Sequence, residues 1–125
     1  MKIVIDLDRT ITQPREGQGY GDSDYDHELV DMLRQYRARG FTIAIYTARN
    51  MRTYAGNLGK INAVTVPGII EWLDRNDIPY DEIHVGKPWC ENAGFYVDDK
   101  AIRPDEFKRL TLEQIYELVG VDAPQ

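Results

Sequence analysis

Short apolar runs and stretches with helical spacing alternate along the chain. Each apolar run is of strand length and is followed by polar residues, which is typical of a buried strand that leaves the core at its carboxyl end. The runs that predict strands cover residues 3–5, 41–46, 82–86 and 94–97.

Two longer stretches between these runs carry apolar residues at helical spacing. The first predicts a helix over 27–39 that ends at Gly40. The second predicts a helix that begins at Thr65, has Pro67 in its first turn and ends before Pro79. The face of the first helix that we expect to be buried consists of Leu29, Val30, Leu33 and Tyr36.

The end of the chain is predicted to be helical as well. A short helix is expected over 104–110, and Thr111 with Gln114 has the form of a capping box before another helix. Strands that alternate with helices indicate an α/β protein, here a Rossmann-like parallel sheet with helices on both faces.

We expect one domain core over 1–120 and a loose tail over 121–125. Two stretches interrupt the pattern and are candidate flaps over a site. The first, 12–26, is polar and rich in glycine, and a mobile surface loop is its alternative interpretation. The second, 51–63, is predicted to be a short helix followed by a loop.

The composition of the chain argues against nucleic acid and membranes as its binding partners. The chain has 125 residues, with 15 basic against 21 acidic side chains and a net charge of −6, and it lacks the basic stripe that nucleic-acid binding needs. No apolar run approaches the length of a membrane span. A single cysteine, Cys90, and the absence of a signal-peptide pattern at the start favour a reduced, cytoplasmic protein.

The polar residues that follow the strands suggest a site. Asp6 and Asp8 are two positions apart, so they share one face at the end of the first strand, and their mutual repulsion must be compensated. In a parallel sheet, ligands bind beyond the carboxyl ends of the strands. Oxygen ligands there would suit Mg²⁺ and a phosphate. The residues that the other strands bring to this edge are Thr47, Lys87, Asp98 and Asp99.

Each of these residues also has an ordinary structural interpretation. Asp6 and Asp8 fit a solvated acidic turn, Thr47 fits a strand-end residue that bonds its own backbone, and Lys87 fits a solvated loop lysine. Their joint placement at successive strand ends favours a functional site.

The residues resemble the haloacid dehalogenase superfamily of phosphatases. Four motifs occur in the order expected for that superfamily: residues 6–10, Thr47, Lys87 and the pair Asp98 and Asp99. The stretches around Lys87 and over 95–104 look like the small phosphatases encoded with bacterial capsule and surface-polysaccharide biosynthesis.

The resemblance implies a role for each matching residue. Asp6 would be the nucleophile, and Asp8 would protonate the leaving oxygen and then activate water. Thr47 would bind a phosphoryl oxygen, and Lys87 would offset negative charge. Magnesium would be held by Asp6, the carbonyl of Asp8 and the terminal pair, of which Asp99 is the favoured direct ligand and Asp98 the water-mediated one.

The chain departs from that superfamily in two respects. Arg9 stands where many members carry glycine or aspartate, which predicts either a less tight turn or a contact with substrate. The chain has no room for a large cap domain, so a large substrate or a homo-oligomer that completes the site is expected. Further candidates for substrate binding are Arg49, Asn50, Lys60 and Trp89, each with a surface or packing role as its alternative.

The sequence therefore predicts a magnesium-dependent phosphomonoesterase for a small phosphorylated metabolite, with a sugar phosphate or polysaccharide precursor expected. Two alternatives remain. One is a binding protein that keeps the fold without catalysis. The other is a phospho-accepting receiver domain, although a receiver carries its adjacent acidic pair on the first strand, where this chain has the spaced pair Asp6 and Asp8.

Overall fold

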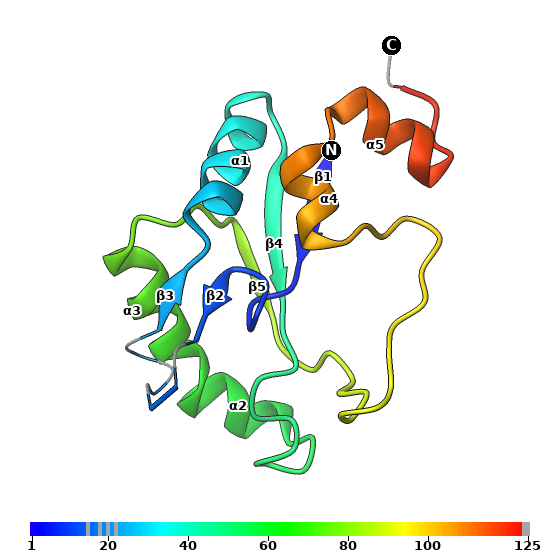
Figure 1. The fold of residues 1–125 in the computed structure, drawn as a ribbon. Helices are drawn as coiled ribbons and strands as arrows, with labels where there is room; N and C mark the ends of the chain where they lie inside the picture. Colours follow the sequence, from blue (N-terminus) through cyan, green and yellow to red (C-terminus); the bar gives the residue numbers. More distant parts are fainter. Residues whose placement is uncertain (15, 18, 20, 22, 124–125) are drawn as a thin grey trace. The chain divides into compact units, whose positions relative to one another are not determined.

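The computed structural model describes the chain except residues 15, 18, 20, 22 and 124–125 (Figure 1). Its residues form two compact units, Met1–Trp89 and Cys90–Gln125, and each is described by itself. The prediction of a single core over 1–120 stays a prediction.

The first unit is built on a parallel sheet. Strands β1 (Lys2–Ile5), β4 (Thr42–Tyr46) and β5 (Glu82–His84) lie side by side in the order β1-β4-β5, as Figure 1 shows. Both pairings are parallel, with Ile3 opposite Ile43 and Ile45 opposite Ile83. The predicted α/β class and the first three predicted strands are confirmed. The first strand begins one residue earlier than predicted, and the other two are slightly shorter.

Helices connect these strands. Helix α1 (His27–Ala38) precedes β4 in the chain, and its predicted face of Leu29, Val30, Leu33 and Tyr36 is buried. Asp26 begins this helix by accepting a hydrogen bond from the Leu29 amide at 3.0 Å. Helices α2 (Leu58–Val64) and α3 (Val66–Arg75) connect β4 to β5. No helix among the described residues is long and apolar enough to cross a membrane.

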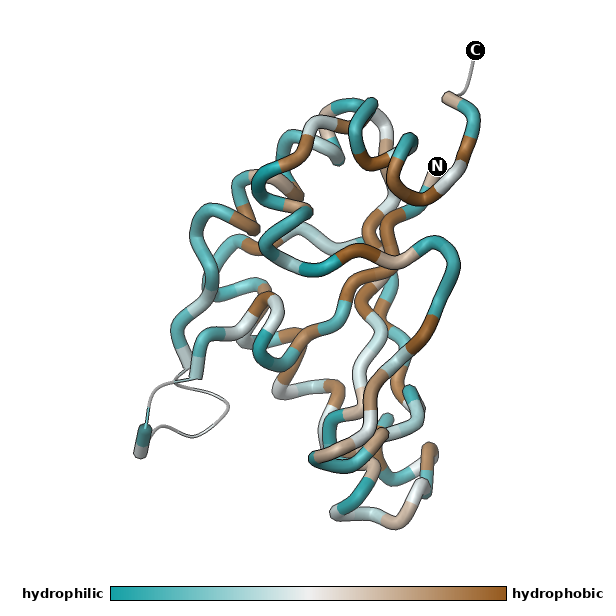
Figure 2. The backbone as a smooth tube through the Cα atoms, turned by 45° about the vertical axis from the view of Figure 1, so that its right-hand side comes forward, coloured by the Kyte–Doolittle hydropathy of each residue, from teal (hydrophilic) through white to brown (hydrophobic). Residues whose placement is uncertain are grey.

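The core lies between the sheet and its helices. Ile43, Ala44 and Ile45 are consecutive in β4 and are each at most 1% exposed, so both faces of the middle strand are covered. Figure 2 shows hydrophobic stretches along the strands of this sheet. The core reaches the carboxyl ends of β1 and β4, where Ile5 and Ile45 are buried. It therefore holds in place the residues that follow these strands.

Two loop predictions change in detail. The ends of the 12–26 stretch pair as an antiparallel hairpin, β2 (Thr12–Gln13) with β3 (Asp24–Tyr25). The part of this flap prediction that falls on residues 15, 18, 20 and 22 lies outside the described residues. The predicted order within 51–63 is wrong, because turns come first and the helix α2 follows. Asn57 explains this order, since its side chain caps α2 by accepting from the Lys60 amide.

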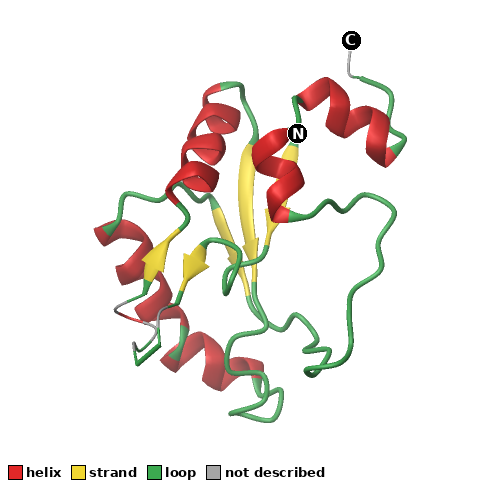
Figure 3. Cartoon of the chain, in the orientation of Figure 1, coloured by secondary structure: helices red, strands yellow, loops and turns green. Residues whose placement is uncertain are grey.

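The predicted strand over 94–97 is wrong. This segment has no strand structure and belongs to the loop drawn between β5 and α4 in Figure 3. Phe95 and Val97 are 80% and 87% exposed. A strand requires a hydrogen-bonded neighbour, and the described residues of the unit Cys90–Gln125 contain no strand that would pair with it. An apolar run alone therefore misled the prediction.

The helices of the second unit agree with prediction. Helix α4 (Pro104–Arg109) starts at a proline, and α5 (Leu112–Val119) follows the capping box formed by Thr111 and Gln114. Gly120 ends α5 in the left-handed conformation.

An ion pair links the two outer strands of the sheet across β4. Lys2 Nζ lies 2.8 Å from Glu82 Oε2. Hydrogen bonds from Lys2, and then from His84, hold the pKa of the Glu82 carboxyl below its usual value. Lys2 and Glu82 are the first residues of β1 and β5, so the pair lies at the amino ends of these strands.

Candidate functional site

The carboxyl ends of β4 and β5 are fastened together by backbone hydrogen bonds. The amide of Thr47 donates to the carbonyl of His84 at 2.9 Å, and the amide of Lys87 donates to the carbonyl of Thr47 at 3.2 Å. These bonds extend the strand pairing by one step past β5. Thr47 and Lys87, which are 40 residues apart in the printed sequence, are therefore neighbours at the predicted edge.

Asp6 lies between a cation and a hydroxyl. Lys87 Nζ is 3.4 Å from Asp6 Oδ1, and Thr10 Oγ1 donates to Asp6 Oδ2 at 3.0 Å. The side chains of Lys87 and Asp6 are 18% and 33% exposed, so the pair is partly shielded but open to a ligand. The predicted proximity of Asp6 and Lys87 is confirmed, whereas their catalytic roles stay predictions.

Asp8 is held by Arg49. The Nη2 and Nε atoms of Arg49 donate to the two carboxylate oxygens of Asp8, at 2.6 and 3.1 Å. The Arg49 side chain is only 6% exposed. The sequence predicts Arg49 as a candidate for substrate binding and does not predict its pairing with Asp8. The signal in the sequence was a cation two residues after Thr47, at the strand next to the one that ends in the aspartates.

Thr47 is 1% exposed, and its hydroxyl oxygen accepts a hydrogen bond from the Arg49 amide at 3.0 Å. This is the local backbone contact that the structural interpretation of Thr47 expected. It is also compatible with a site, because a hydroxyl that accepts can still donate its own proton to a phosphoryl oxygen.

The turn after β1 is tight, contrary to one of the two expectations for Arg9. The amides of Thr10, Ile11 and Thr12 all point to the Leu7 carbonyl, at 2.9 to 3.3 Å. Arg9 adopts a left-handed backbone with φ 62°, and its amide donates to Thr12 Oγ1 at 3.0 Å. The Arg9 side chain is exposed, so its contact with substrate stays a prediction.

The other candidates for substrate binding have partners in the protein. The Asn50 amide group accepts from the Thr65 hydroxyl at 2.7 Å and donates to Thr53 at 3.3 Å, which suits a link between loops. Lys60 Nζ lies 5.0 Å from the centre of the Tyr54 ring. Trp89, which is 40% exposed, has the Arg52 guanidinium 5.3 Å from its ring centre. Substrate contacts of these three residues stay predictions.

Gly86 sets the path of the chain into Lys87, and this gives a stability prediction. Its φ is +88°, and a Cβ there would lie 2.8 Å from Leu58 Cδ2. Gly86→Ala should therefore lower the free energy of unfolding by about 1–2 kcal/mol, because alanine pays the cost of left-handed backbone. Denaturant unfolding measures the loss.

A double variant separates the two causes. Leu58 is 47% exposed, so the clash can be removed by Leu58→Ala at small cost. If backbone strain dominates, Gly86→Ala should be almost as destabilising in the Leu58→Ala background as alone. Full recovery of stability in the double variant would instead assign the effect to the clash.

Asp98 and Asp99 belong to the second unit. Asp98 Oδ1 accepts from the Lys100 amide at 2.8 Å, and both aspartates are exposed. Among the described residues, no three or more histidine, cysteine, aspartate or glutamate side chains form a group that would hold a metal ion. The metal-binding role of Asp98 and Asp99 thus stays a prediction.

The oxygen atoms at the carboxyl edge of the sheet are of the kind that coordinates Mg²⁺. Asp6 offers carboxylate oxygens, and the Asp8 carbonyl accepts none of the turn and loop backbone bonds found among the described residues. Hard oxygen donors of this kind select magnesium over softer metals. The cations Lys87 and Arg49 lie against the carboxyl groups of Asp6 and Asp8. A phosphate dianion would add two uncompensated charges, which a divalent cation would offset.

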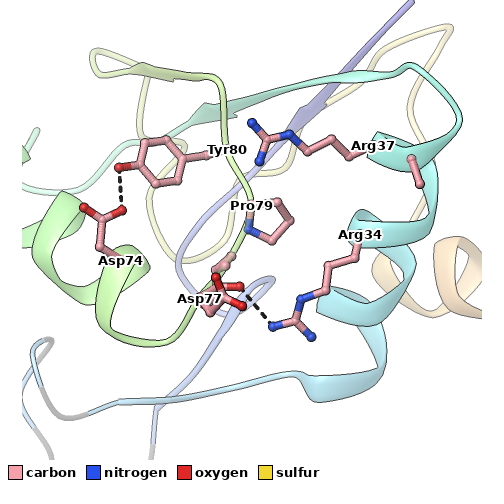
Figure 4. Close-up of a pocket in the computed structure, with 8 residues that line it drawn as sticks. Arg34, Arg37, Asp74, Asp77, Pro79 and Tyr80 are labelled. Atoms are coloured by element: carbon pink, nitrogen blue, oxygen red, sulfur yellow. Dashed lines mark hydrogen bonds between the residues drawn. The ribbon is translucent and has the colours of Figure 1, made fainter.

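A groove of about 660 Å³ lies elsewhere, beside the loop that leads into β5 (Figure 4). Two hydrogen bonds join groups that line it: Tyr80 donates to Asp74 at 2.8 Å, and Arg34 donates to the Asp77 carbonyl at 3.0 Å. The bond to Asp74 raises the pKa of Tyr80. None of the predicted site residues lines the groove, whose walls are Arg34, Arg37, Ala38, Asp74, Asp77, Ile78, Pro79 and Tyr80.

Comparison with known proteins finds a solved structure of the same fold. No protein-family model matches the chain, and no curated protein matches it either. Among solved structures, the chain is similar to the crystal structure of a structural genomics target from Vibrio cholerae, with a TM-score of 0.91 and 51% sequence identity. The similarity covers 95% of this chain and 96% of that chain.

Proposed function

We propose that this chain, which belongs to the same family as the Vibrio cholerae protein, is a magnesium-dependent phosphomonoesterase of the haloacid dehalogenase superfamily. The observation that carries the proposal is the placement of Asp6 at the end of β1, between the Lys87 ammonium group and the Thr10 hydroxyl. Thr47 adjoins Lys87 through a backbone hydrogen bond, so a nucleophile, a cation and a hydroxyl occur at one sheet edge.

The proposed reaction has two halves. A carboxylate oxygen of Asp6 attacks phosphorus, the bond from phosphorus to the leaving oxygen breaks, and Asp8 gives that oxygen a proton. Asp8 then takes a proton from a water molecule, which attacks the aspartyl phosphate and releases inorganic phosphate. The final proton remains on Asp8, so the enzyme returns to its starting state.

The residues around Asp6 would stabilise the transferring group. The Lys87 ammonium offsets charge on phosphoryl oxygens, and the Thr47 hydroxyl donates a hydrogen bond to one of them. A bound magnesium ion would supply the additional positive charge that a phosphate dianion requires. Its proposed ligands in the first unit are the Asp6 carboxylate and the Asp8 carbonyl. A metal-binding role of Asp98 and Asp99 is proposed from the resemblance alone.

The substrate is proposed to be a small phosphorylated metabolite, with a sugar phosphate or polysaccharide precursor favoured by the resemblance to capsule-associated phosphatases. The two insertions near the carboxyl edge are short: one contains the β2-β3 hairpin, and the other contains α2. Neither is the size of a domain, which supports an open site. Such a site would accept a polysaccharide precursor directly, and a second subunit would complete it around a small metabolite.

Dependence on the metal is the direct test. The native protein should hydrolyse a generic aryl phosphate with Mg²⁺ present, and chelation with EDTA should reduce the rate by about 10²-fold or more, since the site loses its divalent charge. Added Mg²⁺ should restore the rate. Release of the aryl alcohol measures turnover.

The same assay can reject the proposal. No turnover with Mg²⁺, or an equal rate after chelation, would contradict a magnesium-dependent phosphatase. Inorganic phosphate that binds without turnover would support the alternative of a binding protein that keeps the fold. A panel of sugar phosphates, nucleotides and phosphorylated acids would then identify the preferred substrate class of an active protein.

A further inference from the structure

The ion pair of Arg49 with Asp8 is a partly buried, two-point contact at the candidate site. Both donors are on one planar guanidinium, and each reaches a different oxygen of the carboxylate, at 2.6 and 3.1 Å. This fork geometry fixes the plane of the carboxylate as well as its position. Asp8 therefore has a defined orientation before any ligand binds.

Separating this pair would be costly. The Arg49 side chain is 6% exposed and that of Asp8 is 28% exposed, so the cation is the deeper partner. A buried charge that loses its partner is left uncompensated in a medium that solvates it poorly. Arg49 is therefore better suited to remain on Asp8 than to leave it for each incoming substrate.

The backbone of Arg49 is held by a second contact, with Thr47. Its amide donates to the Thr47 hydroxyl at 3.0 Å, and Thr47 is bonded in turn to the chain around Lys87. One residue thus connects the proposed phosphoryl-binding hydroxyl to the carboxyl of Asp8. Such a connection holds two groups at a fixed separation, as proton transfer to a leaving oxygen requires.

We propose that Arg49 is a positioning residue that orients Asp8 for proton transfer, in place of a direct role in binding substrate. A carboxylate offers about four lone-pair sites, so a guanidinium that uses two of them leaves others for the transferred proton. This inference rests on the proposed phosphatase function.

Kinetics of Arg49 variants distinguish the two roles. If Arg49 positions Asp8, Arg49→Ala should lower kcat by about 10–100-fold, because a poorly oriented Asp8 loses part of the rate enhancement of general acid catalysis. KM should change less than about threefold. Arg49→Lys keeps the charge but cannot make the two-point contact, so its kcat should lie between that of the native protein and that of Arg49→Ala. The Kd of inorganic phosphate should be nearly unchanged.

The leaving group provides a second measurement. An alkyl phosphate needs its leaving oxygen protonated, whereas an aryl phosphate needs this much less. In single-turnover experiments, the phosphoryl-transfer step of Arg49→Ala should therefore slow more for the alkyl than for the aryl substrate. A merely structural defect would slow this step equally for both substrates.

A double-mutant cycle with Asp8→Asn tests whether Arg49 acts through Asp8. Adding Arg49→Ala to Asp8→Asn should cause little further loss of kcat. Arg39→Ala is the matched control: Arg39 is exposed, and its guanidinium lies 5.7 Å from the Tyr36 ring centre, so it should keep native kinetics. Thermal unfolding checks that each variant is folded, and Arg49→Lys serves if Arg49→Ala is not.

Three results would overturn the inference. These are an increase in KM with kcat unchanged, equal slowing of both substrates, or a full additional loss of kcat in the Asp8→Asn background. Each of them leaves the phosphatase function standing, because the native protein is still active. An inactive native protein would instead refute the proposed function, and with it the role of Arg49.

Discussion

Asp6→Asn is expected to reduce kcat for phosphomonoester hydrolysis by more than about 10³-fold, because an amide oxygen cannot take the place of the nucleophilic carboxylate. The variant should remain folded. Asparagine has nearly the same shape and can still accept from the Thr10 hydroxyl, and the lost contact with Lys87 is a partly exposed ion pair worth at most about 1 kcal/mol. Steady-state kinetics and a thermal melt measure the two effects.

Asp31→Asn is the matched control for this loss. Asp31 is also an aspartate in an ion pair, with Arg34 Nη1 at 2.8 Å, but it lies on the exposed side of α1. It should keep the native rate. Equal turnover by Asp6→Asn and the native protein would rule out Asp6 as the nucleophile.

Lys87→Met should lower kcat by about 10²-fold, because methionine fills a similar volume but cannot offset charge on the phosphoryl group. The Lys87 side chain is 18% exposed and its ammonium lies 3.4 Å from Asp6, so its charge acts next to the proposed nucleophile. The affinity for inorganic phosphate should fall as well. Calorimetry or competitive inhibition measures that affinity.

Lys2→Met provides the comparison. Lys2 is also a lysine paired with a carboxylate on the same sheet, but its partner is Glu82 and the pair is nearer the amino ends of the strands. It should reduce stability slightly and leave kcat and phosphate affinity unchanged. A Lys87→Met variant with native kcat would remove Lys87 from the proposed mechanism.

The sequence predicted the part of the site that depends on strand direction. Asp6, Thr47 and Lys87 follow strands that are recognisable from their apolar runs, and parallel pairing brings strand ends together whatever the loops do. The helix α1 was predictable for a similar reason, since its buried face repeats at the helical period.

The sequence pattern failed where the structure of a segment, or the contact of a side chain, depends on a partner elsewhere in the fold. Residues 94–97 are as apolar as a strand, but a strand also needs a neighbour, and no pattern within four residues reveals one. Arg49 is comparable. Its charge was visible, but whether it faces Asp8 or a ligand depends on side-chain direction, which residue spacing does not specify.

The parallel sheet also determines when the site can form during folding. The aspartates come at the start of the chain, whereas Arg49 follows Asp8 by 41 residues and Lys87 comes later still. A nascent chain that ends before β5 would carry Asp6 without its cation, and no local fragment contains both. Contacts of such long range close slowly, so we expect the candidate site to be among the last parts of the first unit to become ordered.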